Sequence, residues 1–265
     1  MEKLEDLELY NDDCFNVFDK IDEKSVNLFV LDLPYNQTAC NWDNDIIPLE
    51  KMWDNIKRIM KPKGIVIMFC TAKFGYKLIH SNPKWFRYDL IWKKSRKVGF
   101  LSANKMPLRQ HENIYLFSNN HITYCKNGKY GTYNPQKTEG KPYKIKGGKS
   151  KNINGSLSRG REIFSKEYEN KGDRYPSSLI EHYGDSILTY KNPHKTIHRT
   201  QKPVELCEWL IKTYSNEGDT VMDFTMGSAT VGIACLNTNR KFIGVEKDKE
   251  IYEKAETRIM EHLDI

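Results

Sequence analysis

The sequence of 265 residues contains no apolar run that approaches the roughly 18 residues needed for a membrane-spanning helix. Its mean hydropathy is low, at −0.70. The amino-terminal stretch MEKLEDLELY is acidic and lacks the basic and then apolar segments of a secretory signal. These absences predict a cytoplasmic protein that does not associate with a membrane.

The six cysteines follow no ligand pattern, because the chain has no C-x-x-C pair and no histidine at the spacing of a zinc finger. Disulfide frameworks and zinc sites both depend on such spacings. Most of the cysteines lie inside apolar runs. We therefore expect packed thiols, with no disulfide framework and no metal site.

The net charge of the whole chain is only +7, but the positive charge is concentrated in its middle, where acidic residues are scarce. Residues 121–200 hold 16 lysines and arginines against 7 acidic residues, and residues 91–110 hold six basic residues and no acidic one. Concentrated positive charge is typical of proteins that bind a polyanion. A solvated, lysine-rich surface is the alternative that composition leaves open.

Short β-branched apolar runs alternate with helical periodicity, which indicates an α/β protein. Residues 25–35 and 64–71 have the pattern of buried parallel strands, and a helix within 48–64 joins them as a βαβ unit. We predict further strands at 87–95, 112–119, 219–224 and 241–246, and further helices at 202–218, 227–239 and 249–263. One doubly wound, mostly parallel sheet accounts for this order. The segment 121–194, rich in Lys, Gly, Asn and Ser, is expected to be a loop-rich insertion.

The stretch VMDFTMGSATVGIAC (221–235) predicts a strand, a turn of small residues and a helix that begins near Ser228. Such a turn lets a ligand approach the backbone at the carboxyl end of a parallel strand. Glu246 ends the next strand, and an acid roughly 20 residues further on suits hydrogen bonding to ribose hydroxyls. A dinucleotide enzyme has similar spacing, but the full G-x-G-x-x-G is absent and the turn reads G-S-A-T. A plain βαβ turn is the other alternative.

The stretch FVLDLPYNQT (29–38) ends a buried strand in an aspartate, a proline and a tyrosine. Pro34 restricts Leu33 to an extended conformation, which directs the Leu33 carbonyl outward. The Asp32 side chain adds a second acceptor, and Tyr35 adds a flat ring. Two acceptors and a ring suit the exocyclic amino group of a nucleobase, whose nitrogen is a weak nucleophile. An ordinary turn after a strand is the alternative.

Together these motifs resemble the amino-group DNA methyltransferases that use S-adenosylmethionine, and their order is similar to the β subgroup, in which the catalytic motif comes first. The resemblance rests on NDDCFNVFDKIDEKSVNLFVLDLPY, ENIYLFSN, HRTQKPVELCEWLI, DFTMGSAT and RKFIGVEKD. It implies a Rossmann-like methyltransferase fold with a circularly permuted motif order. Residues 1–120 are then the catalytic half, 121–194 an inserted target-recognition region, and 195–265 the cofactor-binding half.

The resemblance also assigns roles to individual residues. The catalytic tetrapeptide comprises Asp32, Leu33 through its carbonyl, Pro34 and Tyr35. The cofactor set comprises Asp13 and Cys14 beside the adenine, Thr200, Gln201 and Lys202 at the methionine end with Pro203, Asp223, Gly227 and Ser228 in the loop, and Glu246 at the ribose. As DNA-binding residues we name Lys93, Lys94, Arg96, Lys97, Lys105, Arg109, Arg159, Arg161 and Arg174.

Three positions depart from the family pattern. Leu33 replaces the first of the two usual prolines, but this position acts through its carbonyl and Pro34 still restrains it. Asn11 and Asp12 stand where a glycine is common, and Ala229 replaces the second glycine of the cofactor loop. We expect activity to survive these changes.

The resemblance thus implies a DNA methyltransferase that transfers a methyl group from S-adenosylmethionine to the N6 amino group of an adenine flipped out of double-stranded DNA. N4-methylation of cytosine, methylation of RNA or of a protein amide, and a DNA-binding protein of the same fold without catalysis are the alternatives. A homodimer and a cognate restriction endonuclease are partners that the resemblance allows. The recognition sequence does not follow from the motifs, because base contacts depend on docking geometry.

Overall fold

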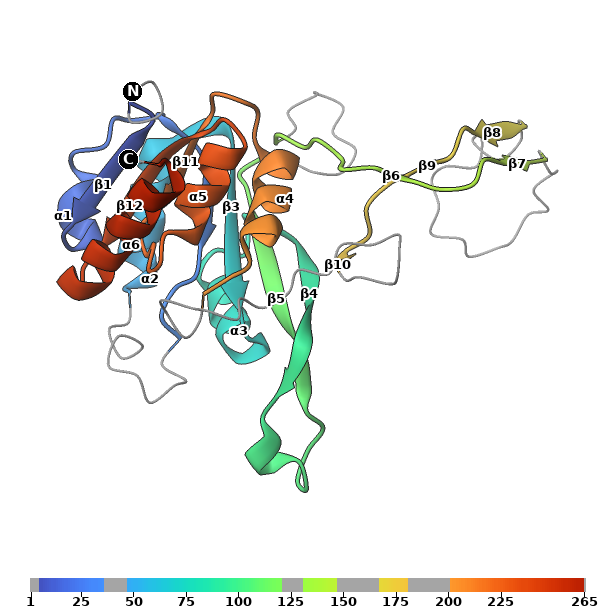
Figure 1. Ribbon diagram of the computed structural model, residues 1–265, viewed down its shortest axis with the longest axis horizontal. Coiled ribbons are helices and arrows are strands. Elements are labelled where there is room, and N and C mark those ends of the chain that lie inside the picture. Colours follow the sequence, from blue (N-terminus) through green and yellow to red (C-terminus); the bar gives the residue numbers. More distant parts are fainter. Residues whose placement is uncertain (1–4, 36–46, 121–130, 147–166, 181–200, 265) are drawn as a thin grey trace.

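The computed structural model describes residues 5–35, 47–120, 131–146, 167–180 and 201–264. In these residues the core is an eight-stranded sheet in the order β1-β12-β11-β2-β3-β5-β4-β10 (Figure 1). Only β5 runs antiparallel to its neighbours, β3 and β4, and the other neighbouring strands of this sheet pair in parallel. The predicted doubly wound, mostly parallel α/β sheet is confirmed.

The strands of the main sheet are β1 (Leu7–Asn11), β2 (Val26–Leu31), β3 (Met60–Cys70), β4 (Phe86–Val98), β5 (Arg109–Phe117), β10 (Leu179–Ile180), β11 (Thr220–Asp223) and β12 (Lys241–Glu246). The helices are α1 (Cys14–Phe18), α2 (Leu49–Ile59), α3 (Ala72–Ser81), α4 (Val204–Tyr214), α5 (Thr230–Asn237) and α6 (Lys249–His262), with a 3-10 turn η3 (Phe100–Ser102). Two small ribbons pair β6 (Thr138–Glu139) with β9 (Asp173–Arg174), and β7 (Tyr143–Ile145) with β8 (Tyr168–Asn170). None of the helices in the described ranges is both long and apolar enough to cross a bilayer.

Different helices cover the two faces of the sheet, and the alternation of side chains along β2 shows how. Leu28 and Val30 point into a core shared with α4, α5 and α6, whereas Phe29 and Leu31 point into a core shared with α1, α2 and α3. All four side chains are fully buried, as expected of a central strand covered on both sides. The predicted βαβ unit is confirmed by the parallel pairing of β2 with β3.

Several element boundaries differ from the sequence prediction, and those of β3 and α5 have a clear physical reason. The strand expected at 64–71 already begins at Met60, directly after α2 ends at Ile59, because Pro62 disfavours a helical conformation at the residue before it. The helix expected near Ser228 begins at Thr230. Its N-cap residue Ala229 has a left-handed backbone with φ of 54°, which delays the helix.

The described part of the insertion contacts the body at several places, among them Thr132, whose backbone N–H donates to the Lys63 carbonyl over 3.3 Å. Strand β10 extends the sheet by pairing in parallel with β4. Asn134 closes the carboxyl end of α4, since its backbone N–H donates to the Thr213 carbonyl over 2.7 Å and its side-chain amide donates to the Ser215 carbonyl over 2.9 Å. The ribbons β6–β9 and β7–β8 extend away from the sheet (Figure 1). The boundaries of an insertion at 121–194 stay a prediction.

Ile56 provides a test of the α2 packing. We expect Ile56→Ala to lower the free energy of unfolding by about 2–5 kcal/mol, because the side chain is fully buried between α2 and the sheet and its removal leaves a cavity. Urea denaturation measures the change. The control is Lys57→Ala on the exposed side of the same helix, which should stay within about 0.5 kcal/mol of the wild type. Equal effects of the two changes would contradict the packing.

Candidate active site

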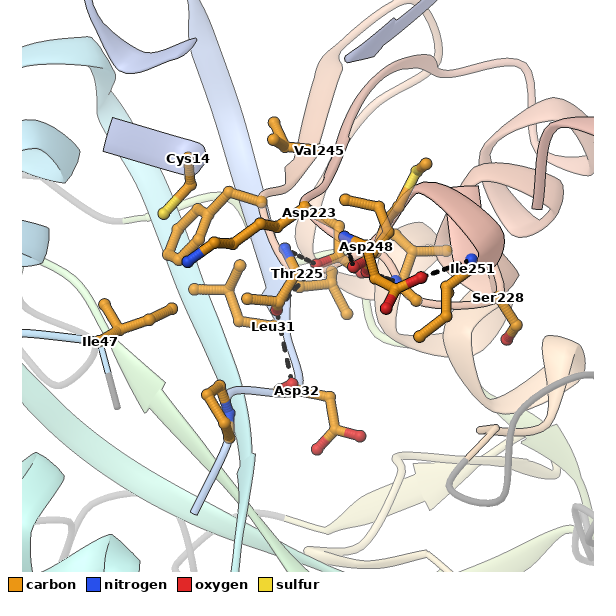
Figure 2. A pocket seen from close by; sticks show the side chains of 18 of the residues that line it. Cys14, Leu31, Asp32, Ile47, Asp223, Thr225, Ser228, Val245, Asp248 and Ile251 are labelled. Carbon is orange, nitrogen blue, oxygen red and sulfur yellow. Dashed lines mark hydrogen bonds between the residues drawn. The ribbon is translucent and has the colours of Figure 1, made fainter. Parts of the chain in front are cut away.

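A pocket of about 730 Å³ lies at the carboxyl ends of β2, β11 and β12. The strand order reverses between β11 and β2, and such a reversal is where open α/β sheets bind ligands. Figure 2 shows Cys14 and Ile47 on one side of this pocket and Ser228 and Ile251 on the other. The predicted site residues that line it are Asp13, Cys14, Asp32, Pro34, Gln201, Lys202, Asp223, Gly227, Ser228 and Glu246.

Two residues of the predicted catalytic tetrapeptide do not line this pocket. Leu33 is almost completely buried, and neither Leu33 nor Tyr35 lines the pocket. Thr200, Arg159 and Arg161 lie outside the described residues. The fold therefore brings the tetrapeptide that begins at Asp32 and the loop that follows Asp223 to one pocket. The Tyr35 ring is not part of the lining of this pocket.

Glu246 holds the turn between β11 and α5. One of its carboxylate oxygens accepts the Gly227 N–H over 3.0 Å, and the other accepts the Asp248 N–H over 2.9 Å. Gly227 has a φ of 50°, a left-handed conformation that glycine adopts without strain. Because each carboxylate oxygen has a second lone pair, Glu246 can hold the turn and still accept hydrogen bonds from a ligand.

Asp223 is buried at the end of β11, and this burial raises its pKa to about 8. The Thr225 N–H donates to its carboxylate over 3.0 Å and partly offsets the effect, while the charges of Asp32 and Glu246 add to it. Six residues of the pocket lining are acidic and two are lysines. Such a lining favours a cationic, hydroxyl-bearing ligand over the pyrophosphate of a dinucleotide.

Both oxygens of the Asp32 carboxylate have partners. The Tyr35 hydroxyl donates to Oδ1 and the Lys202 ammonium donates to Oδ2, each over 2.5 Å. The Asp32 backbone carbonyl accepts the Thr225 hydroxyl over 3.4 Å, and Figure 2 shows the carboxylate pointing away from that turn. Burial and the nearby carboxylates raise the pKa of Tyr35, so the phenol keeps its proton as a donor. The Tyr35 ring packs on Phe74, with 5.0 Å between the ring centroids.

Glu112 is a site residue that the sequence analysis missed. It lies buried on β5, where its carboxylate is 3.2 Å from Lys202 Nζ and 2.5 Å from Lys94 Nζ. Burial alone would raise the pKa of Glu112, but the two lysines lower it below its ordinary value. Burial likewise opposes the charge of Lys202, yet Asp32 and Glu112 raise its pKa overall. The signal in the sequence is a lone acid inside the apolar strand ENIYLF.

The predicted DNA-binding residues fall into different environments. Lys94 is ion-paired with Glu112 and lies over the Trp92 ring at 5.1 Å, so it belongs to the site network. Arg174 donates to the Asn170 side chain and the Lys141 carbonyl within the small ribbons. Lys93 is half-buried on β4. The basic residues exposed on the β4–β5 hairpin are Arg96, Lys97, Lys105 and Arg109.

The cysteines are packed thiols as far as they are described. Cys14, Cys70, Cys207 and Cys235 are free and buried, and the other two lie outside the described residues. Among the residues that the structure places, no group of three or more His, Cys, Asp or Glu side chains is arranged to hold a metal ion.

Residues 26–257 match the DNA methylase family of N6- and N4-specific methyltransferases. This match covers most of the chain, and the protein therefore belongs to that family. The predicted resemblance to amino-group DNA methyltransferases is confirmed, while its β subgroup stays a prediction.

Individual relatives agree with this assignment. The chain is 28% identical to the type II methyltransferase M1.MboII of Moraxella bovis, over 95% of this chain and 96% of the relative. It is 26% identical to M.HpaI of Haemophilus parainfluenzae, over 90% of this chain and 69% of the relative.

Two solved structures share the fold. The complex of M1.HpyAVI with SAM has a TM-score of 0.59 at 21% identity and covers 95% of this chain and 99% of its own. The cytosine-N4-specific PvuII DNA methyltransferase has a TM-score of 0.64 at 14% identity and covers 95% of this chain and 86% of its own.

The raised pKa of Asp223 predicts how the stability of the ligand-free protein depends on pH. The folded protein holds this proton more tightly than the unfolded chain, whose aspartate has a pKa near 3.8, so stability falls as pH rises between these values. From pH 5 to pH 7 the wild type should lose up to about 1.4 kcal/mol per pH unit relative to Asp223→Asn. Urea denaturation at several pH values measures this difference. Parallel stability profiles of the two proteins would contradict the assignment.

Proposed function

We propose that this protein transfers the methyl group of S-adenosylmethionine to the N6 amino group of an adenine flipped out of double-stranded DNA. The observation that carries the proposal is the position of the Asp32 carboxylate at an acid-lined pocket, in a member of the DNA methylase family. Pro34 lines the same pocket, and Tyr35 donates its hydroxyl to Asp32.

The chemistry of the pocket supports S-adenosylmethionine as the cofactor. This molecule carries a sulfonium and an ammonium cation, and it supplies an activated methyl group. The acidic lining offers counter-charges to both cations. Glu246 keeps lone pairs for ribose hydroxyls while it holds the turn. Cys14 and Ile47 offer an apolar edge to an adenine ring.

Asp32 and the Leu33 carbonyl act on the nucleophile. Both are acceptors, and hydrogen bonds from the two amino protons of the base make its nitrogen more tetrahedral and more nucleophilic. The new C–N bond forms as the C–S bond breaks, and the alkylated amine then loses a proton. Lys202 holds Asp32 in place and balances its negative charge, which the site needs because the surroundings are largely buried. Alignment of the reacting atoms supplies much of the acceleration.

The choice of base rests on the tetrapeptide. An aspartate at the first position of the tetrapeptide and a tyrosine at the last are more typical of the adenine enzymes in the family that the chain resembles, whereas a serine at the first position is commoner among the cytosine-N4 enzymes. The alternative is N4-methylation of cytosine, because the PvuII methyltransferase, which shares the fold, is cytosine-N4-specific. A protein that has lost catalysis would not be expected to retain Asp32, Tyr35, Asp223 and Glu246 together.

Double-stranded DNA is the substrate that fits the exposed basic side chains of the β4–β5 hairpin. The type II names of the relatives support a role in restriction and modification, with a cognate endonuclease as a partner. We keep the homodimer, the cytoplasmic location and the target-recognition role of 121–194 as parts of this proposal.

The reaction is tested by incubating unmethylated DNA of diverse sequence with the protein and S-adenosylmethionine, followed by mass spectrometry of the nucleosides. We expect N6-methyladenine with the wild type and a loss of about 100-fold or more with Asp32→Ala, because the acceptor at the reacting nitrogen is gone. Binding of the cofactor to both proteins controls for folding. N4-methylcytosine as the product would overturn the choice of base. Bound cofactor without any methylated DNA would overturn the DNA substrate, and RNA would be tested next.

Glu112 is a positioning residue, and Glu112→Gln tests it. The change keeps the shape of the side chain but leaves Lys202 with one carboxylate, so we expect kcat to fall by about tenfold with little change in the KM for the cofactor. A fall in kcat at an unchanged KM for the cofactor indicates that Glu112 acts through the position of Lys202 and Asp32. The matched control is Glu253→Gln, whose carboxylate pairs with Lys249 on α6. A change in KM as large as the change in kcat, or no change in either, would show that Glu112 is only structural.

A further inference from the structure

The hairpin of β4 and β5 carries an exposed apolar tip. Figure 1 shows the hairpin projecting beyond the rest of the sheet. Leu101 is 100% exposed and Phe100 is 81% exposed, and Val98 and Met106 are also largely in water. Large apolar side chains gathered on a protrusion are unfavourable in water and mark an interaction site.

The tip is a built turn. Gly99 begins it with a φ of 93°, a conformation that favours glycine, and a Cβ at this position would meet no atom within 4 Å. The Ser102 N–H donates to the Gly99 carbonyl over 2.9 Å, and the Lys105 N–H donates to the Ser102 carbonyl over 2.9 Å. These bonds hold η3 in shape, so Phe100 and Leu101 are presented to solvent by an ordered backbone.

The charge around the tip selects a polyanion as its partner. Residues 91–110 contain six basic residues and no acidic one, and the basic side chains on both strands next to the tip are exposed. A second copy of this hairpin would be repelled by the same charge. Duplex DNA fits, because its phosphates attract the flanks and its major groove admits a two-stranded ribbon.

The root of the hairpin lies at the candidate active site. Glu112 on β5 contacts Lys202, which in turn contacts Asp32, and Glu112 lies opposite Trp92 on β4. From Trp92 to Val98 the strand extends by about 20 Å at the usual rise of a β-strand. A duplex whose target base reaches Asp32 therefore lies within reach of the tip.

We propose that Phe100 and Leu101 are a wedge that enters the base stack of duplex DNA beside the target base, while the basic flanks of the hairpin hold the phosphates. The inference rests on the proposed DNA methyltransferase function. Flipping a base breaks its stacking on both neighbours at a cost of a few kcal/mol. Apolar side chains inserted at a base step replace part of that stacking, and architectural proteins that bind the minor groove use phenylalanine and leucine as such wedges.

The test uses a DNA site that the wild-type protein is first shown to methylate. Methylation is then compared between two duplexes that both contain this site. One duplex is fully paired, and the other has a mismatch opposite the target base, which makes flipping easier. For the double variant Phe100→Ala with Leu101→Ala, we expect methylation of the paired duplex to fall by about tenfold or more, and methylation of the mismatched duplex to stay within about threefold of the wild type. The fluorescence of 2-aminopurine at the target position should report less flipping in the paired duplex.

Three controls separate the wedge from other roles. Tyr76→Ala removes a similarly exposed aromatic side chain from α3 and should leave the methylation of both duplexes unchanged. Lys97→Ala should weaken binding to both duplexes alike and reduce the salt slope of the affinity by about 0.9, whereas the double variant should keep the wild-type slope. Thermal unfolding of the double variant should match the wild type, because both side chains are exposed.

Several outcomes overturn the wedge. The first is an equal loss of methylation on the two duplexes, and the second is no loss on either. The third is a wild type that sediments as a dimer while the double variant sediments as a monomer, because the tip would then hold two copies of the chain together. If the wild type methylates no DNA, the proposed function fails. The wedge is then tested only by comparing the affinities of the wild type and of the double variant for duplex DNA. The double variant should then bind duplex DNA about tenfold more weakly at an unchanged salt slope, and equal affinity would overturn the inference.

Discussion

A buried ammonium group is the constraint on which the arrangement of the site depends. Lys202 Nζ lies 2.5 Å from Asp32 and 3.2 Å from Glu112, and few of its side-chain atoms reach solvent. A charge in such surroundings costs several kcal/mol unless opposite charges accompany it. Its two partners come from the loop after β2 and from β5, while Lys202 itself precedes α4. One ion network therefore ties together three segments that are far apart in the sequence.

The reversal of strand order places this network beside the acidic pocket. Asp32 follows β2 and Asp223 ends β11, and the two strands are neighbours at the reversal. The pocket thus has an acidic part around Asp223 and Glu246, and an edge where Lys202 balances the charge of Asp32. A cationic methyl donor suits the acidic part, and an uncharged base suits the edge. The geometry of the sheet brings the two requirements into contact.

Local sequence patterns predict the parts of the site that depend on one strand and the turn after it. The runs that end in Asp32 and Asp223 are apolar and β-branched, so their strands, their parallel pairing and the shared pocket follow from pattern and topology. Glu112 was missed because its importance arises only from partners contributed by distant segments. The late start of α5 depends on the backbone of Ala229, which residue type alone does not specify. β1 was missed because its side chains are only partly buried, which weakens its signal.

The Glu112 carboxylate connects the candidate active site with the β4–β5 hairpin, the element that we propose to face DNA. Glu112 pairs with Lys94 from β4 and with Lys202 from just before α4, so it lies between the root of the hairpin and Asp32. β4 and β5 form a long antiparallel pair, with an irregularity in the ladder between Lys93 and Val98. A change in the distance from Lys94 to Glu112 alters the field at Lys202, which in turn holds Asp32. Ion pairs through Glu112 therefore connect the hairpin that we propose to lie on DNA with the carboxylate that we propose to hold the amino group of the base.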